Sequence, residues 1–148
     1  MNFVVMPVGW DEYRQELNAV RRVVFIEEQR VPEHLETDAW DGRSLHVLAC
    51  DLAQNPIGCG RLLPDGHLGR MAVLNAWRGQ GVGRAILARL LGLARESGMN
   101  NIEISAQVHA LEFYRKAGFK VYGDVYEEAG IPHCTMHLWL GLRRGSSL

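Results

Sequence analysis

The stretch Arg78-Gly79-Gln80-Gly81-Val82-Gly83-Arg84 lies between an apolar run typical of a β-strand, residues 68–74, and a run with helical spacing, residues 82–97. Three glycines in five residues permit positive φ and let the backbone come close to a ligand. A helix that begins here points its unpaired N–H groups and its positive dipole end into the same turn. Such a turn binds anions, most often phosphate. The sequence therefore predicts that the backbone of this turn holds a phosphorylated cofactor.

Length, charge and cysteine content exclude several classes of protein. The chain has 148 residues, 47% of them hydrophobic, which suffices for one well-filled core and predicts a single domain over residues 1–148. The net charge is −1 and the basic residues are scattered, so we expect no nucleic-acid partner and no membrane partner. The N-terminus does not resemble a signal peptide, and no stretch is long and apolar enough to span a bilayer. Three cysteines without a CxxC pair favour reduced thiols and a cytoplasmic protein.

Alternating periodicities predict the order of the elements. We expect strands over residues 2–8, 44–52, 57–63, 67–74, 101–107, 119–126 and 133–140, and helices over residues 10–25, 82–97 and 109–117. Residues 27–43 have no clean period and are interpreted as a long loop, which in a compact domain is usually functional or disordered. This order predicts an α/β fold of the α+β kind, with a mixed sheet and helices on both of its faces.

Three interpretations of the glycine turn compete. A P-loop requires GxxxxGK followed by Ser or Thr, and no lysine lies near the turn. A dinucleotide-binding oxidoreductase requires GxGxxG, which neither glycine frame fits, although Glu103 follows Gly83 by about 20 residues as the ribose-binding acid of that fingerprint would. The third interpretation is the Q/R-x-x-G-x-G turn of acetyl-CoA-dependent N-acetyltransferases, which residues 78–83 match letter for letter.

Further motifs extend this match. Gly69-Arg70-Met71-Ala72-Val73 precedes the turn, and Ala110-Leu111-Glu112-Phe113-Tyr114-Arg115-Lys116-Ala117-Gly118-Phe119 follows the next strand. With these motifs the chain resembles the GNAT (Gcn5-related N-acetyltransferase) superfamily. It is similar in particular to its ElaA-like branch, through VFIEEQ at residues 24–29, the acidic residues Glu36, Asp38 and Asp41, and EAGIPH at residues 128–133. The resemblance covers almost the whole chain and implies a mostly antiparallel, seven-stranded sheet whose central strands splay apart.

The resemblance also implies the chemistry. Acetyl-CoA is then the co-substrate, and a primary amine of a small molecule or peptide attacks its thioester directly, without a metal. The glycine turn would hold the pyrophosphate, and the strand before it would pair with the pantetheine arm and supply an oxyanion donor, which in other enzymes is worth roughly 2.7–4 kcal/mol. The residues that the resemblance implies for the cofactor are Met71, Ala72, Val73, Arg78, Gly79, Gln80, Gly81, Val82, Gly83, Arg84, Gln107 and Tyr114.

Tyr114 matches the tyrosine that in many relatives protonates the departing thiolate. A phenol suits that role because its pKa of about 10 lies near that of a thiol, about 8.5. The alternative is an aromatic side chain that packs under the cofactor together with Phe113. Gln107 stands where many relatives carry an asparagine that touches the cofactor, and it is equally compatible with capping the following helix.

The general base is left open by the sequence. His67 lies four residues before Met71, where some relatives place a catalytic glutamate, and a neutral imidazole suits deprotonation near pH 7. Glu28 is the preferred candidate for gripping or deprotonating an amine, Glu103 is a weaker one, and a chain of waters is the alternative to all three. Gln29 and His133 are expected to bind the acceptor. The carboxylates Glu28, Glu36, Asp38 and Asp41 suit a cationic acceptor or, equally, a solvated acidic loop.

Two other functions to compare with the sequence are a metal site and a non-catalytic binding module. His133 and His137 are four residues apart, but a strand separates them by about 13 Å, so no metal site is expected. A non-catalytic acyl-CoA-binding or regulatory module with the same fold is the alternative to an enzyme. The last strand and the tail Gly141-Leu142-Arg143-Arg144 are compatible with a homodimer.

Overall fold

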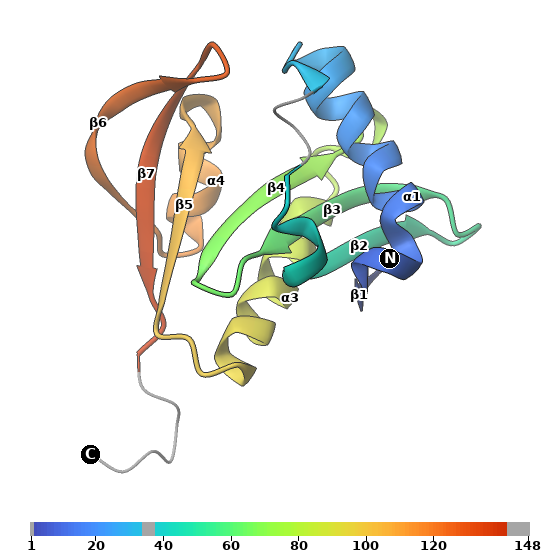
Figure 1. The fold of residues 1–148 in the computed structure, drawn as a ribbon, viewed down its shortest axis with the longest axis horizontal. Coiled ribbons are helices and arrows are strands. Elements are labelled where there is room, and N and C mark those ends of the chain that lie inside the picture. Colours follow the sequence, from blue (N-terminus) through green and yellow to red (C-terminus); the bar gives the residue numbers. More distant parts are fainter. Residues whose placement is uncertain (1, 34–37, 142–148) are drawn as a thin grey trace.

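A seven-stranded mixed sheet organises the computed structural model, which describes residues 2–33 and 38–141 (Figure 1). The strand order is β1-β2-β3-β4-β5-β7-β6, and every neighbouring pair is antiparallel except β4 and β5. The strands are β1 (Phe3–Val8), β2 (Leu45–Asp51), β3 (Pro56–Leu62), β4 (His67–Val73), β5 (Asn101–Gln107), β6 (Lys120–Glu128) and β7 (Ile131–Trp139). The predicted mixed, mostly antiparallel sheet is confirmed.

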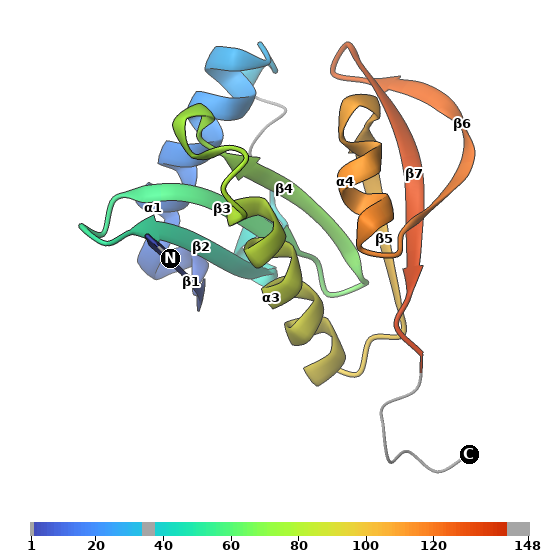
Figure 2. The same cartoon turned by 180° about the vertical axis from the view of Figure 1, so that it is seen from behind.

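Helices cover both faces of this sheet, as expected. They are α1 (Trp10–Arg21), α3 (Val82–Glu96) and α4 (Leu111–Lys116), with short helical segments η1 (Arg22–Glu28), η2 (Asp41–Arg43), η3 (Asn75–Trp77) and η4 (Val108–Ala110). Helix α1 lies on one face, and α3 and α4 lie on the other (Figures 1 and 2). Side chains that alternate along the strands serve the two faces: Leu48 packs in the cluster of α1, and Val47 in that of α3. Among the described residues, no helix combines the length and apolarity needed to cross a bilayer.

Two predicted boundaries were wrong. The first helix does not run to Phe25 as an α-helix, because after Arg21 the chain continues as the π-helix η1 to Glu28. The last two strands are also longer than expected and meet in a two-residue turn. Ala129 and Gly130 both have positive φ, 52° and 77°, which is the geometry of a type I′ hairpin turn.

A bulge in β4 separates the two halves of the sheet. Cys59 of β3 pairs with Ala72, and Arg61 pairs with Gly69, so that Gly60 alone stands opposite two residues of β4. The extra residue lies at Arg70, which adopts a left-handed φ of 50°. A bulge bends a strand and increases its twist. Accordingly β4 pairs with β5 only at His67 and Leu68 and then diverges from it, which confirms the predicted splay (Figure 1).

Glycine in β3 lets α3 approach the sheet closely at this point. A Cβ atom on Gly60 would lie 2.7 Å from Leu90 Cδ1, 2.8 Å from Met71 Sδ and 2.9 Å from Ile86 Cγ2, distances that packed atoms do not adopt. Helix α3 therefore rests directly on the backbone beside the bulge, and its position depends on the absence of a side chain there.

We predict that Gly60→Ala destabilises the fold by about 1–3 kcal/mol, the usual cost of overpacking a core. The matched control is Gly92→Ala. Gly92 lies within α3, a Cβ there meets nothing within 4 Å, and alanine is favoured over glycine in helix interiors by about 1 kcal/mol. Urea unfolding should show opposite signs for the two substitutions, and a neutral or stabilising Gly60→Ala would contradict the packing argument.

Candidate active site

The glycine turn presents free backbone donors at the start of α3. Gly81 is the N-cap residue with φ 88°, no side chain caps the helix, and the first intrahelical N–H is that of Ala85, which donates to the Gly81 carbonyl. The N–H groups of Val82, Gly83 and Arg84 therefore precede the helical ladder. A Cβ atom on Gly79 or Gly81 would meet no atom within 4 Å, so the space in front of the turn is open. Backbone donors and open space are what the predicted phosphate site requires, and its occupant stays a prediction.

The strand before the turn has an edge, beyond Leu68, that no strand of the described residues pairs with. The Leu74 N–H donates to the Ile57 carbonyl of β3 at 2.9 Å. Because residues of an antiparallel strand alternate in the direction of their N–H and C=O groups, Val73 and Met71 point theirs away from β3, into the space between β4 and β5. Ala72 pairs with Cys59 and is directed toward β3. Of the three residues predicted to pair with the pantetheine arm, two therefore offer backbone groups at this edge.

Arg78 connects this edge to the end of η1. Its Nε donates to the Val73 carbonyl at 2.9 Å, and its Nη2 donates to Glu28 Oε1 at 2.8 Å. The sequence treated Arg78 only as part of the backbone turn, so this side-chain role was missed. Glu28, the preferred candidate for contact with the amine, is thereby held beside the glycine turn.

The next residue, Gln29, reaches the opposite strand. Its amide and that of Gln107, the last residue of β5, form two reciprocal hydrogen bonds of 3.1 and 2.8 Å. His109 Nε2 lies 2.5 Å from Gln107 Oε1, and since an amide oxygen only accepts, the imidazole donates. The consecutive residues Glu28 and Gln29 therefore tie the end of η1 to both diverging strands. The sequence assigned Gln29 to the acceptor and Gln107 to the cofactor, and the structure joins the two side chains.

Tyr114 lies on α4 in the core under this region. It packs edge-on against Phe113 and Phe119, at ring-centroid distances of 5.0 and 5.7 Å, and it is buried. A Cβ on Gly83 would lie 3.4 Å from the Phe113 ring and 3.7 Å from Val73 Cγ2, so α4, the turn and the end of β4 converge here. Burial raises the pKa of Tyr114 well above its usual value. The phenol therefore stays protonated throughout the physiological range, as a proton donor must.

His67 lies at the closed end of the splay. Its Nε2 is 2.5 Å from Glu103 Oε2, and its Nδ1 is 2.9 Å from Asp65 Oδ1. Burial lowers the pKa of His67, but hydrogen bonds and charges from Asp65 and Glu103 outweigh it, so that the net shift is upward. Carboxylates beside both nitrogens favour the cationic form of the ring, which has no lone pair with which to accept a proton. A base role for His67 stays a prediction and requires it to leave one carboxylate.

The acidic residues of the loop contact arginines of the protein itself where the structure describes them. Asp41 is buried and accepts hydrogen bonds from Arg21 at 3.0 Å and Arg61 at 3.1 Å. Asp38 accepts from Arg61 at 2.7 Å and from Arg70 at 3.2 Å. Both predicted alternatives were wrong for the buried Asp41, whereas Asp38 is exposed and pairs with arginines at the same time, so the two aspartates hold side chains of α1, β3 and β4. Glu36 lies outside the described residues, as do Leu142, Arg143 and Arg144 of the tail.

His133 lies beside Gln107, its partner in the β5–β7 register. Its Nδ1 is 2.6 Å from the Ile131 carbonyl, its ring stacks on that of Tyr126, and its Nε2 is 3.7 Å from Glu128 Oε2. Sequence reasoning missed the position of Glu128 because it ended this strand at Tyr126, two residues too early. The signal was the Ala129-Gly130 pair, which in a two-residue turn places Glu128 opposite Ile131.

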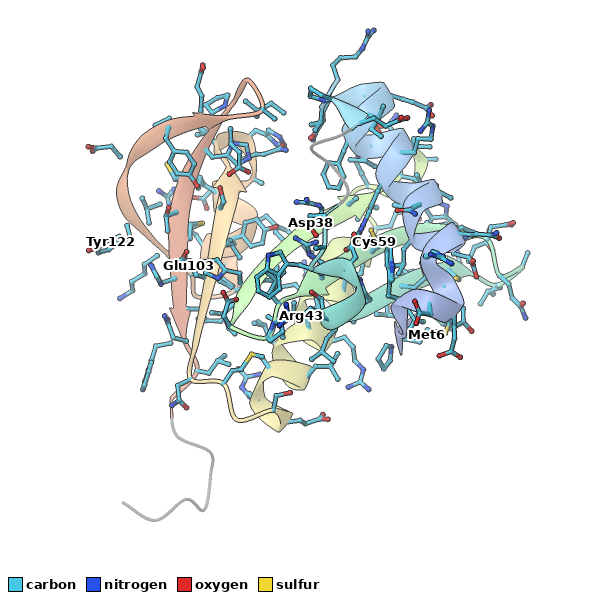
Figure 3. The ribbon with its side chains drawn as sticks, viewed as in Figure 1. Met6, Asp38, Arg43, Cys59, Glu103 and Tyr122 are labelled. Atoms are coloured by element: carbon cyan, nitrogen blue, oxygen red, sulfur yellow. The ribbon has the colours of Figure 1, made fainter. Side chains whose placement is uncertain are left out.

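Glu103 belongs to a second group of side chains on the same face. It contacts His67 and, at 3.5 Å, His137 Nε2, and it lines a pocket with Lys120, Val121, Tyr122 and His137. Figure 3 shows Glu103 on β5 toward β4, whereas Tyr122 projects from the outer strand β6. Within residues 2–33 and 38–141, no three histidine, cysteine or acidic side chains are grouped as metal ligands.

Comparison with known proteins identifies the family. The sequence profile of the acetyltransferase (GNAT) domain matches residues 11–140. The Bacillus subtilis (strain 168) protein YjcF, described as an uncharacterized N-acetyltransferase, is 37% identical over 121 residues, which cover 79% of this chain and 86% of that protein. Escherichia coli (strain K12) ElaA is 30% identical over 125 residues, which cover 79% and 81%.

Solved structures agree with the sequence comparison. The crystal structure of E. coli ElaA superposes with a TM-score of 0.80 at 27% identity over 90% of this chain and 98% of that one. An acyl-CoA N-acyltransferase from Pseudomonas aeruginosa superposes equally well, with a TM-score of 0.80 at 29% identity over 91% and 98%. The resemblance read from the sequence, including the ElaA-like branch, is confirmed.

We predict a pH-dependent stabilisation by Asp38. Burial raises the pKa of this carboxyl, but hydrogen bonds and charges from Arg61 and Arg70 outweigh that effect, so that the net pKa lies below its ordinary 3.8. A depressed carboxyl pKa stabilises the fold above the unfolded-state pKa, and this contribution is lost as the pH falls through the folded-state pKa. Asp38→Asn should therefore reduce the free energy of unfolding at pH 6 by on the order of 1 kcal/mol, and the difference from wild type should shrink as the pH falls below 3.8 and vanish below the still lower folded-state pKa. Asp124→Asn, on the exposed strand β6, is the control, and a pH-independent Asp38→Asn effect would refute the ion-pair account.

Proposed function

The chain belongs to the GNAT N-acetyltransferase family, and from that premise we propose that it transfers an acetyl group from acetyl-CoA to a primary amine of a small molecule or peptide. The observation that carries this proposal is the continuity of two binding surfaces. The free edge of β4 at Met71 and Val73 runs directly into the open N-terminus of α3. A ligand with a polar, amide-containing arm and a diphosphate is complementary to that sequence of backbone groups.

We assign the donor to this surface residue by residue. The N–H groups of residues 79–84 would receive the diphosphate, and the edge of Met71 to Val73 would pair with the pantetheine amides. Arg78 now occupies the Val73 carbonyl, so it would have to yield this acceptor to an incoming amide. The positive charge of Arg78 beside the turn also favours an anionic donor.

Tyr114 is the proposed general acid. Its burial keeps the phenol protonated, and proton donation to a departing thiolate is chemically matched because the two groups have neighbouring ordinary pKa values of about 10 and 8.5. A backbone N–H of the β4 edge would polarise the thioester carbonyl while Tyr114 supplies the proton that the departing sulfur takes up. The reaction then still requires a group that deprotonates the amine.

The acceptor would bind on the face that carries α1, beside Glu28, Gln29 and His133. Glu28 supplies a carboxylate for an ammonium group, and the paired amides of Gln29 and Gln107 supply neutral donors and acceptors. Glu28 and His67 both stay predicted base candidates. Cytoplasmic location and a homodimer stay predictions that the described residues do not address.

Binding and turnover test the proposal in two steps. Calorimetric titration should show acetyl-CoA binding in the micromolar range and no binding of NADH. Release of free CoA thiol, followed with a thiol reagent, should then depend on an added amine, with spermidine, kanamycin and a glycine-initiated peptide as probes of three acceptor classes. Failure to bind acetyl-CoA would refute the cofactor assignment, whereas binding without release for any amine would favour the non-catalytic acyl-CoA-binding module.

We predict that Tyr114→Phe lowers kcat by about 10²- to 10⁴-fold, the usual contribution of a positioned acid, while the Kd for acetyl-CoA changes by less than about twofold. Because the pKa of Tyr114 is raised, the wild-type rate should show no alkaline decline from this group below pH 10. Tyr122→Phe is the matched control, since that ring is 71% exposed on β6. An unchanged kcat in Tyr114→Phe would remove Tyr114 as the acid.

A further inference from the structure

The tautomer of the neutral His133 ring is set by its surroundings. The side chain is 7% exposed, and Nδ1 lies 2.6 Å from the Ile131 carbonyl oxygen. A carbonyl oxygen only accepts hydrogen bonds, so Nδ1 must carry the hydrogen. In the neutral ring this leaves the lone pair on Nε2, which is the nitrogen that faces away from the Ile131 carbonyl.

Glu128 stands where it can stabilise the ring once Nε2 is protonated. Its Oε2 is 3.7 Å from His133 Nε2, while its Oε1 accepts a hydrogen bond of 3.4 Å from the Ser105 hydroxyl. The type I′ turn at Ala129 and Gly130 sets the register that places this carboxylate two residues along β6 from Tyr126, the cross-strand partner of His133. The titratable groups that face His133 are therefore Glu128 and Tyr126 from β6 and, beyond Gln107, His109 from η4.

We propose that His133 is the general base of the transfer reaction and that Glu128 is its positioning residue. This inference rests on the proposed function. It assigns the general base, which the sequence left open, and gives His133 a role in proton transfer where the sequence predicted acceptor binding. The register partner of His133 is Gln107, at the end of β5, so the basic nitrogen belongs to the same end of the splay as the edge of β4 proposed to hold the thioester.

The proton account closes with one base and one acid. His133 Nε2 takes one proton from the acceptor ammonium, and the freed lone pair forms the C–N bond. The C–S bond breaks with its electron pair on sulfur, which takes the proton of Tyr114, and the second proton that leaves nitrogen restores the phenol. The products are the amide, the free thiol and one proton, which His133 releases to solvent.

The other candidates are engaged in ways that oppose this role. Both nitrogens of His67 face carboxylates, which favours the cationic ring. Glu103 lies between His67 and His137, and Glu28 is paired with Arg78. His133 differs from all three because its polar contacts orient one nitrogen and leave the other basic.

Kinetics of matched variants test the assignment. His133→Ala should lower kcat/KM about 100-fold for the amine of the panel that reacts fastest. If no amine reacts, the same loss is expected for the slow hydrolysis of acetyl-CoA. The substitution should also remove the acid limb of the pH–rate profile, the fall in rate at low pH. Added imidazole should restore part of the loss. His137→Ala, four residues along the same strand, should stay within about twofold of wild type, and Glu128→Gln should shift the limb without abolishing activity. An unchanged pH profile in His133→Ala overturns the proposal.

The tautomer gives a readout that needs no acceptor. Two-bond ¹H–¹⁵N correlation spectra of the free protein should show the neutral His133 ring with its hydrogen on Nδ1, and acetyl-CoA binding should be retained by His133→Ala within about twofold. A hydrogen on Nε2 of the neutral ring overturns the proposal whatever the kinetics. If the wild-type protein does not bind acetyl-CoA, the proposed function is refuted instead. Failure of the His133 assignment and failure of the proposed function are therefore distinguishable.

Discussion

One residue of β3 stands opposite two residues of β4, and the rest of the site depends on this mismatch. Perfect pairing would continue the parallel ladder of β4 and β5 and consume the backbone groups of Met71 and Val73. The bulge stops that ladder after Leu68, so the strand edge beyond it is free for a ligand. The left-handed backbone of Arg70 is the local cost, which is typical of strain stored at functional sites.

A split sheet needs other contacts to hold its two halves in place. At the closed end His67 and Glu103 bridge β4 and β5, and at the open end Glu28 and Gln29 reach Arg78 and Gln107. Beneath the loop before β2, Asp41 neutralises Arg21 and Arg61 in a buried network. Such networks contribute little net stability compared with apolar packing, but breaking one partner is costly, so they fix geometry. The polar contacts of this protein therefore position the backbone that the bulge exposes.

The sequence was sufficient for the sheet and the glycine turn, because each has a local pattern or a motif, whereas the splay was predicted only through the resemblance to the family. Ile102, Ile104 and Ala106 alternate with polar residues and are buried as expected. The π-helix η1 was missed because its wider turn has no distinct periodicity, and the burial of Asp41 was missed because its arginines lie 20 residues away in either direction. The β6–β7 hairpin was predicted too short, because Pro132 argues against a continuous strand. What depends on a distant partner was therefore not readable from local order.

The histidines show how partners, more than positions, decide chemistry. His67 and His133 both lie on strands of the same sheet, and the sequence marks both as candidates. Two carboxylates favour the cationic form of His67, and its contact with Glu103 joins β4 to β5. A backbone carbonyl orients His133 without adding charge, so the ring keeps a basic nitrogen. A carboxylate 3.7 Å away then favours the cation only after a proton has arrived. His133 can therefore accept a proton from the acceptor amine, and Glu128 stabilises the resulting cation. A general base requires this arrangement.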